Sequence, residues 1–461
     1  MKIILAIKVT VSALLLLGAT TSLGFKNHSE SSTPIPNSLY HWKTNIELGG
    51  GFVLTTFLTA EKTENQISIR SPKNADIRVF GRFKSYLGRL LGKLPSKGTF
   101  IRIEGTMKED SISGKAFIAV MGELQFKGAL KHDSISGYLL KNDTLKVGKL
   151  SGKLSDESRL NYTQLYSQTL RLVQEHIYNK DVLMSKKWMG FQQNFKSLCA
   201  KAQDDLELFI GFSTYRSKLP FSHFYLIMQE EQDSDTIASE KAVHFEEKPN
   251  GIGYLKIDNF STSAEELKEI MPRIVEKAYP HLIVDLRNNS GGGVEAAYAF
   301  ASHLVNTNTD IGYFTTNRFK FESFDTNTFN QLPEVEPETT EGFIAYLMQN
   351  DGAKMIVKAH QNEIFSGQLY LLTNSNTAST CEPIVYVLKA LENVTVIGES
   401  TAGAMLSANY FELYGKYKLV IPIADFFTMD GERLDGEGVQ PDVLVASDSA
   451  MVKTLQLIQG H

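Results

Sequence analysis

The chain has 461 residues, enough for about two to four domains with a sizeable core. Its 42% hydrophobic and 21% charged residues are ordinary for a globular protein. The formal net charge is −5. A nucleic-acid-binding protein would be expected to have a basic face, so the composition argues against that function.

The N-terminus has the pattern of a secretory signal peptide. Lys2 and Lys8 precede an apolar run over residues 9–19, and small and polar residues follow. A membrane anchor is the less favoured alternative, because a full span needs about 20 apolar residues. No cysteine lies near the end of this segment, so a lipid-modified N-terminus is not expected. We expect residues 1–24 to be a signal peptide and residues 25–38 a linker. The protein is then exported, periplasmic or extracellular, without a stable membrane span.

Cys199 and Cys381 are the two cysteines. Two cysteines do not make a disulfide framework, although they are able to pair in an exported protein. The favoured interpretation is that both are small apolar helix residues. A thiol nucleophile at Cys381 is the less favoured alternative.

Residues 39–155 are predicted to form an antiparallel β domain. Runs such as residues 100–104 alternate apolar and polar side chains, and turns of Gly, Asp and Ser separate them. The turn sequence DSISG occurs at residues 110–114 and again at 133–137, and a looser third copy begins at Asp143. This repeat favours a meander, in an open barrel or a sandwich. The segment contains no cluster with catalytic spacing, so we interpret it as a structural or docking module.

Residues 160–222 change to helical periodicity. Apolar residues recur at helical spacing from Leu165 to Ile177 and again from Trp188 to Leu198. Asp204 is placed to cap a third helix. We expect a small helical cap that ends near Pro220.

Residues 223–461 alternate strands, glycine-rich loops and helices, which predicts an α/β domain. Residues 281–285 are largely apolar, as in the strands of a parallel sheet. Residues 264–277 form an amphipathic helix, which Pro272 is expected to kink. In open α/β sheets, the loops at the carboxyl ends of the strands hold ligands.

A serine in one of these loops is a candidate nucleophile. A short strand over residues 369–372 leads into a small-residue loop that contains Ser379, and a helix over residues 381–391 follows. The start of a helix offers unpaired N–H groups to a developing negative charge. A simple helix cap is the alternative, because Ser and Thr are preferred at that position.

The glycine-rich loop at residues 287–293, RNNSGGG, is the second candidate site. Backbone N–H groups of such a loop can bind a phosphate or stabilise an oxyanion. The loop lacks the spacing and the lysine of nucleotide-binding motifs. An oxyanion site and a plain structural turn therefore remain as interpretations.

Together, the two loops resemble those of the C-terminal processing peptidases, serine peptidases with a fold related to the Clp protease and crotonase superfamily. Residues 285–292, DLRNNSGG, resemble the family's DLRxNxGG, and residues 374–382, NSNTASTCE, resemble its N-x-x-SASASE loop. Residues 438–442, GVQPD, resemble its closing GVxPD. The resemblance extends from about residue 162 to residue 445. It implies a Clp protease/crotonase-like α/β core, with Ser379 as the nucleophile.

The chain departs from the best-known branch of this family in two ways. That branch uses a lysine as general base, in a position where this chain has Ala404. It also inserts a PDZ domain, and the interval from His223 to Gly253 is too short for one. The branch of the tricorn protease core and the retinoid-binding-protein modules is more similar, since residues 398–403, GESTAG, resemble its G-E-x-T-A-G.

The resemblance to this second branch implies a base upstream of the sheet. Ser222 and His223 stand at the place of a Ser-His pair in the tricorn core, which implies His223 as general base and Ser222 as the group that orients its ring. The implied acid is Asp435, and Glu437 is the alternative carboxylate. Adjacent residues of a strand face opposite sides, so Ser222 and His223 can cooperate only where the backbone is irregular.

The implied oxyanion hole consists of the backbone N–H groups of Gly291 or Gly292 and of Thr380. The resemblance thus implies an exported serine endopeptidase with a polypeptide substrate. One alternative is a non-catalytic ligand- or peptide-binding module on the same fold, which the missing lysine favours, and another is crotonase-like acyl chemistry. No motif indicates a cofactor or a metal ion, and the sequence does not indicate the oligomeric state.

Overall fold

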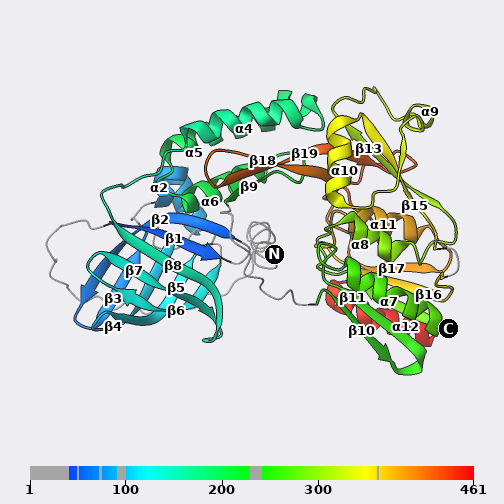
Figure 1. Cartoon of the computed structure of the whole chain (residues 1–461), viewed down its shortest axis with the longest axis horizontal. Helices are drawn as coiled ribbons and strands as arrows, with labels where there is room; N and C mark the ends of the chain where they lie inside the picture. Colours follow the sequence, from blue (N-terminus) through cyan, green and yellow to red (C-terminus); the bar gives the residue numbers. More distant parts are fainter. Residues whose placement is uncertain are drawn as a thin grey trace.

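The computed structural model of the chain describes residues 41–48, 51–71, 75–90, 100–119, 121–228, 241–360 and 363–460. The expected signal peptide and linker lie outside these residues. Figure 1 shows a β-barrel and an α/β part that lie apart from each other. Helix α4 (Thr163–His176) and the strands β18 (Leu406–Glu412) and β19 (Tyr417–Phe427) extend between the two.

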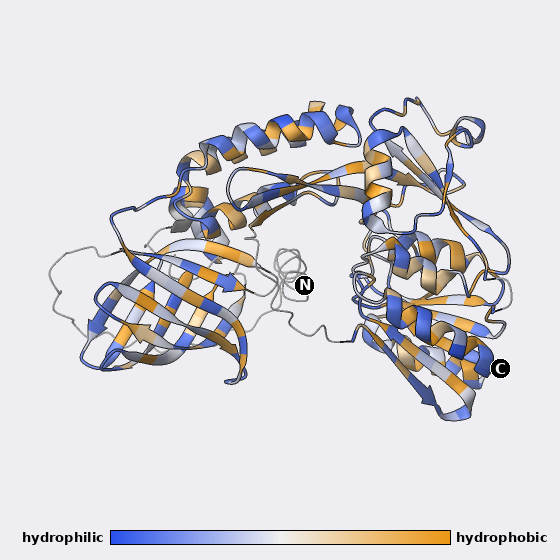
Figure 2. Cartoon of the chain, viewed as in Figure 1, coloured by the Kyte–Doolittle hydropathy of each residue, from blue (hydrophilic) through white to orange (hydrophobic). Residues whose placement is uncertain are grey.

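The N-terminal part is a closed antiparallel barrel of eight strands. Each strand pairs with the next, and the first pairs with the last, so that no strand edge stays open. The predicted antiparallel meander is confirmed, and both full copies of the turn repeat begin return strands. Figure 2 shows hydrophobic and hydrophilic residues alternating along these strands, as expected when one face points inward. The strands are β1 (His41–Leu48), β2 (Phe52–Thr63), β3 (Gln66–Arg70), β4 (Ile101–Lys108), β5 (Ser111–Ile118), β6 (Gly122–Leu130), β7 (Ser134–Lys141) and β8 (Leu145–Ser155).

Two short helices interrupt the barrel sequence between β3 and β4. They are α2 (Ala75–Phe80) and α3 (Arg82–Leu90), separated by Gly81 with φ of +78°. The expectation that this whole region forms strands is wrong here. Apolar residues from Phe83 to Leu90 recur at helical rather than alternating spacing, and such a short helical pattern is easily missed in a strand-rich segment.

The helical cap consists of α4, η1 (Lys180–Met184), α5 (Lys186–Lys201) and α6 (Asp205–Arg216). Asp204 caps α6 as predicted, because its side chain accepts a hydrogen bond from Glu207 N at 2.9 Å. An aromatic core fixes the cap to the segment that follows it. Its ring centroids lie between 5.2 and 5.5 Å from their neighbours, and its members are Phe191, Phe195, Phe212 and Phe224.

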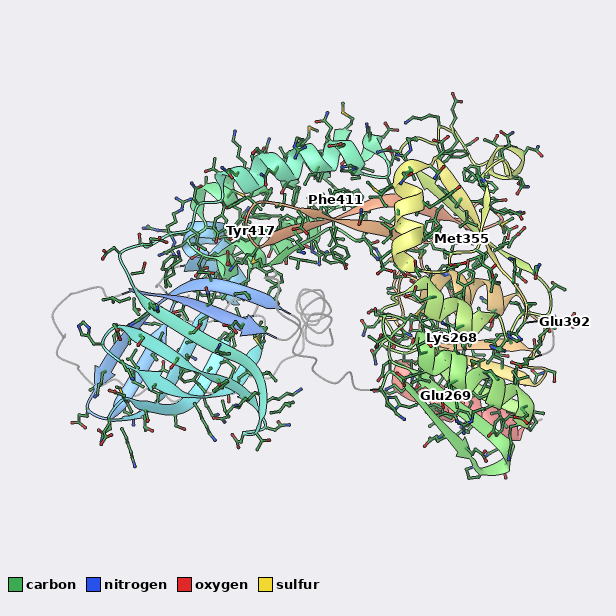
Figure 3. All side chains as sticks on the ribbon, viewed as in Figure 1. Lys268, Glu269, Met355, Glu392, Phe411 and Tyr417 are labelled. Atoms are coloured by element: carbon green, nitrogen blue, oxygen red, sulfur yellow. The ribbon has the colours of Figure 1, made fainter. Side chains whose placement is uncertain are left out.

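Asp205 joins the cap to the barrel and to the β18–β19 hairpin. Its carboxylate accepts hydrogen bonds from Thr55 N at 2.7 Å and from the Tyr417 hydroxyl at 2.6 Å. Lys416 Nζ lies 2.7 Å from Asp205 Oδ2, and the side chains are 12% and 0% exposed. Figure 3 labels Tyr417 at this end of the hairpin and Phe411 farther along it. One hairpin therefore connects the barrel junction to the α/β part.

The first sheet of the α/β part has the strand order β10-β11-β12-β16-β17-β20 and is parallel except for β10. Apolar residues of α7, α8 and α11 pack on one face, and those of α12 pack on the other. The α/β prediction is confirmed. The elements are β10 (Val243–Lys248), η2 (Pro249–Gly251), β11 (Ile252–Ile257), α7 (Ala264–Lys277), β12 (His281–Asp285), α8 (Val294–Ala301), β16 (Gln368–Thr373), α11 (Cys381–Lys389), β17 (Val394–Gly398), β20 (Val443–Leu444), η3 (Ser447–Ser449) and α12 (Ala450–Gln459).

The second sheet has the order β14-β15-β13-β19-β18, and β9 pairs with the other end of β19. Its apolar side chains share a core with α8 and α11 of the first sheet. The remaining elements are β9 (Tyr225–Met228), β13 (Thr309–Thr316), α9 (Thr326–Phe329), β14 (Glu334–Val335), α10 (Thr340–Gln349) and β15 (Gly352–Val357). No helix within the described ranges is both long and apolar enough to cross a lipid bilayer.

Candidate active site

The loop that carries the candidate nucleophile connects β16 to α11 at the carboxyl end of the parallel sheet. Ser379 has a φ of +58°, in the left-handed region that side chains other than glycine rarely adopt. The strand and the helix predicted around Ser379 are confirmed by β16 and α11. A strained turn of this kind persists only where surrounding groups hold it.

Glu382, in the first turn of α11, holds this turn. Its buried carboxylate accepts hydrogen bonds from Ser379 N at 3.0 Å, Ala404 N at 2.8 Å and Gly403 N at 2.7 Å. The hydroxyl of Thr401 donates a fourth, at 2.7 Å. Burial raises the pKa of this carboxyl group, and the four donors offset part of the effect. Glu382 was not among the site residues predicted from the sequence, although it ends the NSNTASTCE motif.

The glycine-rich loop after β12 packs directly against the nucleophile loop. A Cβ atom on Gly291 would lie 2.7 Å from Ala378 O, so this contact requires glycine. Ala378 N donates to Asn289 O at 3.0 Å, and the Thr380 hydroxyl donates to Gly292 O at 2.8 Å. The two loops, predicted separately from the sequence, thus form one surface.

Backbone N–H groups for an oxyanion are present on this surface. Gly291 N donates to the Asn289 side chain at 2.9 Å, and Ser379 N is bound by Glu382. The N–H groups of Gly292 and Thr380 donate no hydrogen bond to any described residue. Of the predicted donors, the geometry therefore favours Gly292 and Thr380 over Gly291.

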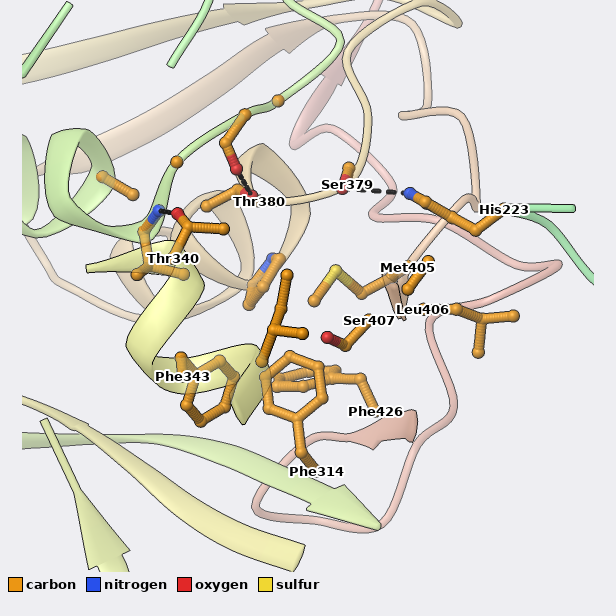
Figure 4. Close-up of a pocket in the computed structure, with 18 of the residues that line it drawn as sticks. His223, Phe314, Thr340, Phe343, Ser379, Thr380, Met405, Leu406, Ser407 and Phe426 are labelled. Carbon is orange, nitrogen blue, oxygen red and sulfur yellow. Dashed lines mark hydrogen bonds between the residues drawn. The ribbon is translucent and has the colours of Figure 1, made fainter. Parts of the chain in front are cut away.

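His223 approaches the serine from the segment between the helical cap and β9. Its Nε2 lies 3.3 Å from Ser379 Oγ (Figure 4). The φ of His223 is +53°, so the backbone is irregular here, as cooperation with Ser222 requires. The Ser222 Oγ lies 2.7 Å from His223 Nδ1. Phe221 and Phe224 flank the pair and are buried, which anchors the segment in the aromatic core of the cap.

Asp435 completes this series of hydrogen bonds. The Ser222 hydroxyl donates to Asp435 Oδ1 at 2.5 Å, and Ser222 N donates to Oδ2 at 3.4 Å. Because the hydroxyl proton goes to the carboxylate, the Ser222 oxygen accepts a hydrogen bond from His223 Nδ1–H. This tautomer leaves a lone pair on Nε2, facing Ser379.

The surroundings of the two candidate carboxylates differ. Asp435 is 3% exposed, and burial raises its pKa, although the hydroxyl of Ser222 and the charge of Arg433 act in the opposite direction. Arg433 Nη2 lies 3.1 Å from Asp435 Oδ2, and Arg433 Nε lies 2.6 Å from the carboxylate of Asp425. Glu437 is exposed, and its side chain makes no hydrogen bond to a described residue. The fold brings Asp435, and not Glu437, to Ser222.

Neither cysteine is placed to react. Both thiols are free and buried, one in α5 and one at the start of α11, as expected for small apolar helix residues. Burial raises the pKa of Cys199 to about 12, and it also raises the pKa of Cys381. A reactive thiolate needs a lowered pKa, so the geometry favours the serine.

Among the described residues, His303, His360 and Glu363 are the group whose side chains lie near enough to share a metal ion. The two imidazole rings are stacked, with centroids 4.6 Å apart and 18° between their planes. Lone pairs of stacked rings do not converge on one ion. None of the three residues lines the cavity beside Ser379.

A cavity of about 690 Å³ opens beside Ser379 and His223 (Figure 4). Its wall away from the serine is apolar and includes Phe314, Phe343 and Phe426, which are all buried. Residues of β18 form another wall. The described residues that line the cavity include no lysine or arginine. The cavity thus fits an apolar side chain held next to the serine.

Comparison with known families and curated proteins shows similarity to peptidases of one family. Residues 251–445 match the model of peptidase family S41. The carboxy-terminal processing protease CtpA of Bacillus subtilis is 28% identical over 212 residues, which are 45% of this chain and 38% of that protein. The carboxyl-terminal-processing protease of Synechocystis is 24% identical over 195 residues, which are 42% of this chain and 38% of that protein. The matches therefore span well under half the length of these relatives.

Several solved structures are also similar to this chain. A lipoprotein from Streptococcus agalactiae has 18% identity and a TM-score of 0.44, over 64% of this chain and 96% of that one. The photosystem II D1 C-terminal processing protease has 15% identity and a TM-score of 0.39, over 63% and 94%. The tricorn protease has 14% identity and a TM-score of 0.42, over 87% and 46%. The match of the family model and the curated relatives thus shows that residues 251–445 are similar to peptidase family S41.

Proposed function

We propose that this chain is a serine endopeptidase that cleaves polypeptides, with Ser379 as nucleophile and His223 as general base. The observation that carries the proposal is the continuous series of contacts from Ser379 Oγ through His223 and Ser222 to the buried Asp435. A serine hydroxyl attacks a peptide only when a base removes its proton, and the base needs a fixed tautomer.

In the acylation step, His223 Nε2 takes the proton of Ser379 Oγ as the oxygen attacks the scissile carbonyl carbon. The resulting imidazolium is stabilised through Ser222 by the carboxylate of Asp435. The carbonyl oxygen becomes an oxyanion beside the N–H groups of Gly292 and Thr380.

Collapse of the tetrahedral intermediate breaks the C–N bond. The imidazolium gives its proton to the leaving amine, and an acyl ester remains on Ser379. In the second step, His223 takes a proton from water, which attacks the ester, and the proton returns to Ser379 Oγ as the acid product leaves. No cofactor or metal ion enters this sequence of steps.

We propose that the substrate binds as an extended strand along β18. This strand pairs only with β19 among the described residues, so it has an edge available for strand addition. Ser407 to Tyr410 of β18 line the cavity next to Ser379. A strand added there places alternate side chains toward the cavity, and its apolar wall selects a large apolar side chain at the cleaved bond.

Hydrolysis of an unfolded protein by the full chain and by Ser379→Ala tests the catalytic proposal. We expect activity in the wild type and its loss in the variant. Labelling of Ser379 by a fluorophosphonate, located by peptide mapping, distinguishes a peptidase from the alternative of a binding module on the same fold. Equal hydrolysis by both proteins, with no label on Ser379, would contradict the proposal.

We also propose that the protein is exported. The charged and apolar pattern of residues 1–24 supports this, since it is typical of a signal peptide. N-terminal sequencing of the protein from a fractionated host tests it. Retention of residues 1–24 in a cytoplasmic fraction would contradict export.

A further inference from the structure

Helix α3 turns its apolar face to solvent. Phe83, Tyr86, Leu87 and Leu90 are 77%, 64%, 41% and 69% exposed. Their spacing of i, i+3, i+4 and i+7 places them in one stripe about 100° wide along the helix. Such a stripe normally faces a protein core, and a contiguous exposed apolar surface marks an interaction site.

Positive charges border this stripe on both sides. At about 100° per residue, Arg82 and Arg89 lie along one side of the stripe, and Lys84 lies along the other. Ser85 lies on the opposite face of the helix and is buried against the protein. The helix contains no acidic residue, although the chain as a whole has a formal net charge of −5. The net charge of α3 is therefore positive, whereas the net charge of the whole chain is negative.

The preceding helix anchors α3 to the folded body. Tyr215 of the cap packs edge-on against Phe80 of α2, with ring centroids 6.3 Å apart, and its hydroxyl donates to Val79 O at 3.4 Å. Arg78 of α2 lies 2.5 Å from the buried carboxylate of Glu207. Figure 1 shows α2 beside α5 and α6. The stripe is thus presented by an anchored helix.

We propose that α3 docks on the surface of an anionic lipid bilayer and lies in the plane of that surface. The stripe enters the boundary between head groups and acyl chains, while the basic side chains reach the lipid phosphates on either side. Apolar contact alone also fits an unfolded polypeptide, but cations along both borders, with no acidic residue, favour an anionic plane. This inference is independent of the proposed catalysis.

A local probe in the full chain tests the docking. The two native tryptophans, Trp42 and Trp188, are 7% and 2% exposed, so their emission is little affected by a surface contact. In the variant Phe83→Trp, the introduced indole starts in water. With vesicles of phosphatidylcholine and phosphatidylglycerol we expect its emission to shift to the blue, and brominated acyl chains to quench it. Pure phosphatidylcholine vesicles should produce a much smaller change.

A sedimentation experiment with the same vesicles assigns the binding to α3. We expect the pair Phe83→Ser and Leu90→Ser to lower the bound fraction at least about tenfold. The matched control removes two exposed apolar side chains elsewhere, with Met184→Ser and Leu444→Ser, which are 80% and 72% exposed in the native chain, and should bind as the wild type does.

Charge reversal at Arg82→Glu and Lys84→Glu should lower binding to anionic vesicles as well, and added salt should weaken the wild type. Equal sedimentation of wild type and the α3 variants would overturn the proposal, as would an unshifted indole. A blue shift with unfolded casein but not with vesicles would also overturn it, and would make α3 a polypeptide-binding surface instead.

Discussion

The backbone N–H of Ser379 donates a 3.0 Å hydrogen bond to the buried carboxylate of Glu382. The strained backbone of the candidate nucleophile is therefore held by a charged group that is 0% exposed and has no direct access to a substrate. Two further backbone N–H groups and one hydroxyl donate to the same carboxylate. This single side chain ties the nucleophile loop to the turn that contains Ala404.

We expect Glu382→Gln to lower the free energy of unfolding by about 3 kcal/mol, because the carboxamide presents donors where the protein needs an acceptor. Peptidase activity should be lost as the turn relaxes. Urea unfolding and hydrolysis measure the two effects. The control is Glu392→Gln on the exposed surface, which should change stability by no more than about 0.5 kcal/mol. Similar stabilities of the two variants would contradict this role of Glu382.

The acid assignment predicts different effects for two neighbouring carboxylates. Asp435→Asn removes the negative charge and replaces one accepting oxygen with a donating NH2 group, so the orientation of Ser222 is disturbed and the proton on His223 is no longer fixed on Nδ1. We expect kcat to fall by about 100-fold or more, with slower fluorophosphonate labelling of Ser379. Glu437→Gln, at an exposed position, should keep nearly full activity. The opposite ranking in steady-state kinetics would show that the acid is Glu437.

The junction between barrel, cap and hairpin predicts an unequal effect of two lysine substitutions. Lys416→Met leaves the buried charge of Asp205 without its cation, so we expect a loss of about 3 to 5 kcal/mol in unfolding free energy. The control, Lys418→Met, removes a partly exposed pair with Glu412 at 3.0 Å, worth about 0 to 1 kcal/mol. Chemical denaturation measures both, and equal losses would argue against the junction as a stabilising contact.

Burial of acidic groups at the same junction predicts a pH-dependent stability. Burial raises the pKa of Glu207 to about 8 and that of Asp204 to about 6, despite the nearby Arg78. In the unfolded chain both carboxyl groups have a pKa of about 4. Between these values the folded protein binds more protons, so stability should fall as pH rises from about 5 to about 8.

Calorimetric Tm values across that range measure the pH effect. Glu207→Gln should flatten the dependence, because it removes the group that releases its proton last. A wild-type Tm that rises with pH over this window, or an unchanged slope in the variant, would contradict the prediction.

The apolar cavity predicts a change in substrate preference. Phe343→Leu shortens a side chain in one wall and so enlarges the cavity. We therefore expect the rate of cleavage after tryptophan or phenylalanine to rise relative to the rate after alanine. The matched control is Phe329→Leu, a buried residue of the same part that does not line the cavity. Each costs about 1 kcal/mol of stability, but only the first should alter the ranking in a fluorogenic peptide series. An equal change of the ranking in both variants would show that the cavity does not determine substrate preference.

Local patterns were sufficient for much of the fold. Alternating residues identified the barrel strands, and the strand–loop–helix rhythm identified the α/β part, because both depend on neighbours in the chain. The expectation of an open barrel or a sandwich is wrong, because the barrel is closed by the pairing of β1 with β8, from opposite ends of the domain, and no local pattern indicates that pairing. The short helix α3 was missed because its pattern is brief and lies among strands.

The sequence by itself determined that Ser379 stands in a loop between a strand and a helix, and that a glycine-rich loop follows another strand of the same sheet. Only the tertiary structure shows that Asp435 lies within hydrogen-bond distance of Ser222 and that the N–H of Gly291 already donates to Asn289. The bond from Ser222 to Asp435 joins residues 213 positions apart, and the neighbouring His223 has a positive φ that no local pattern reveals. Distances of this kind result from the packing of whole elements, so the chemistry of the site is set by the fold.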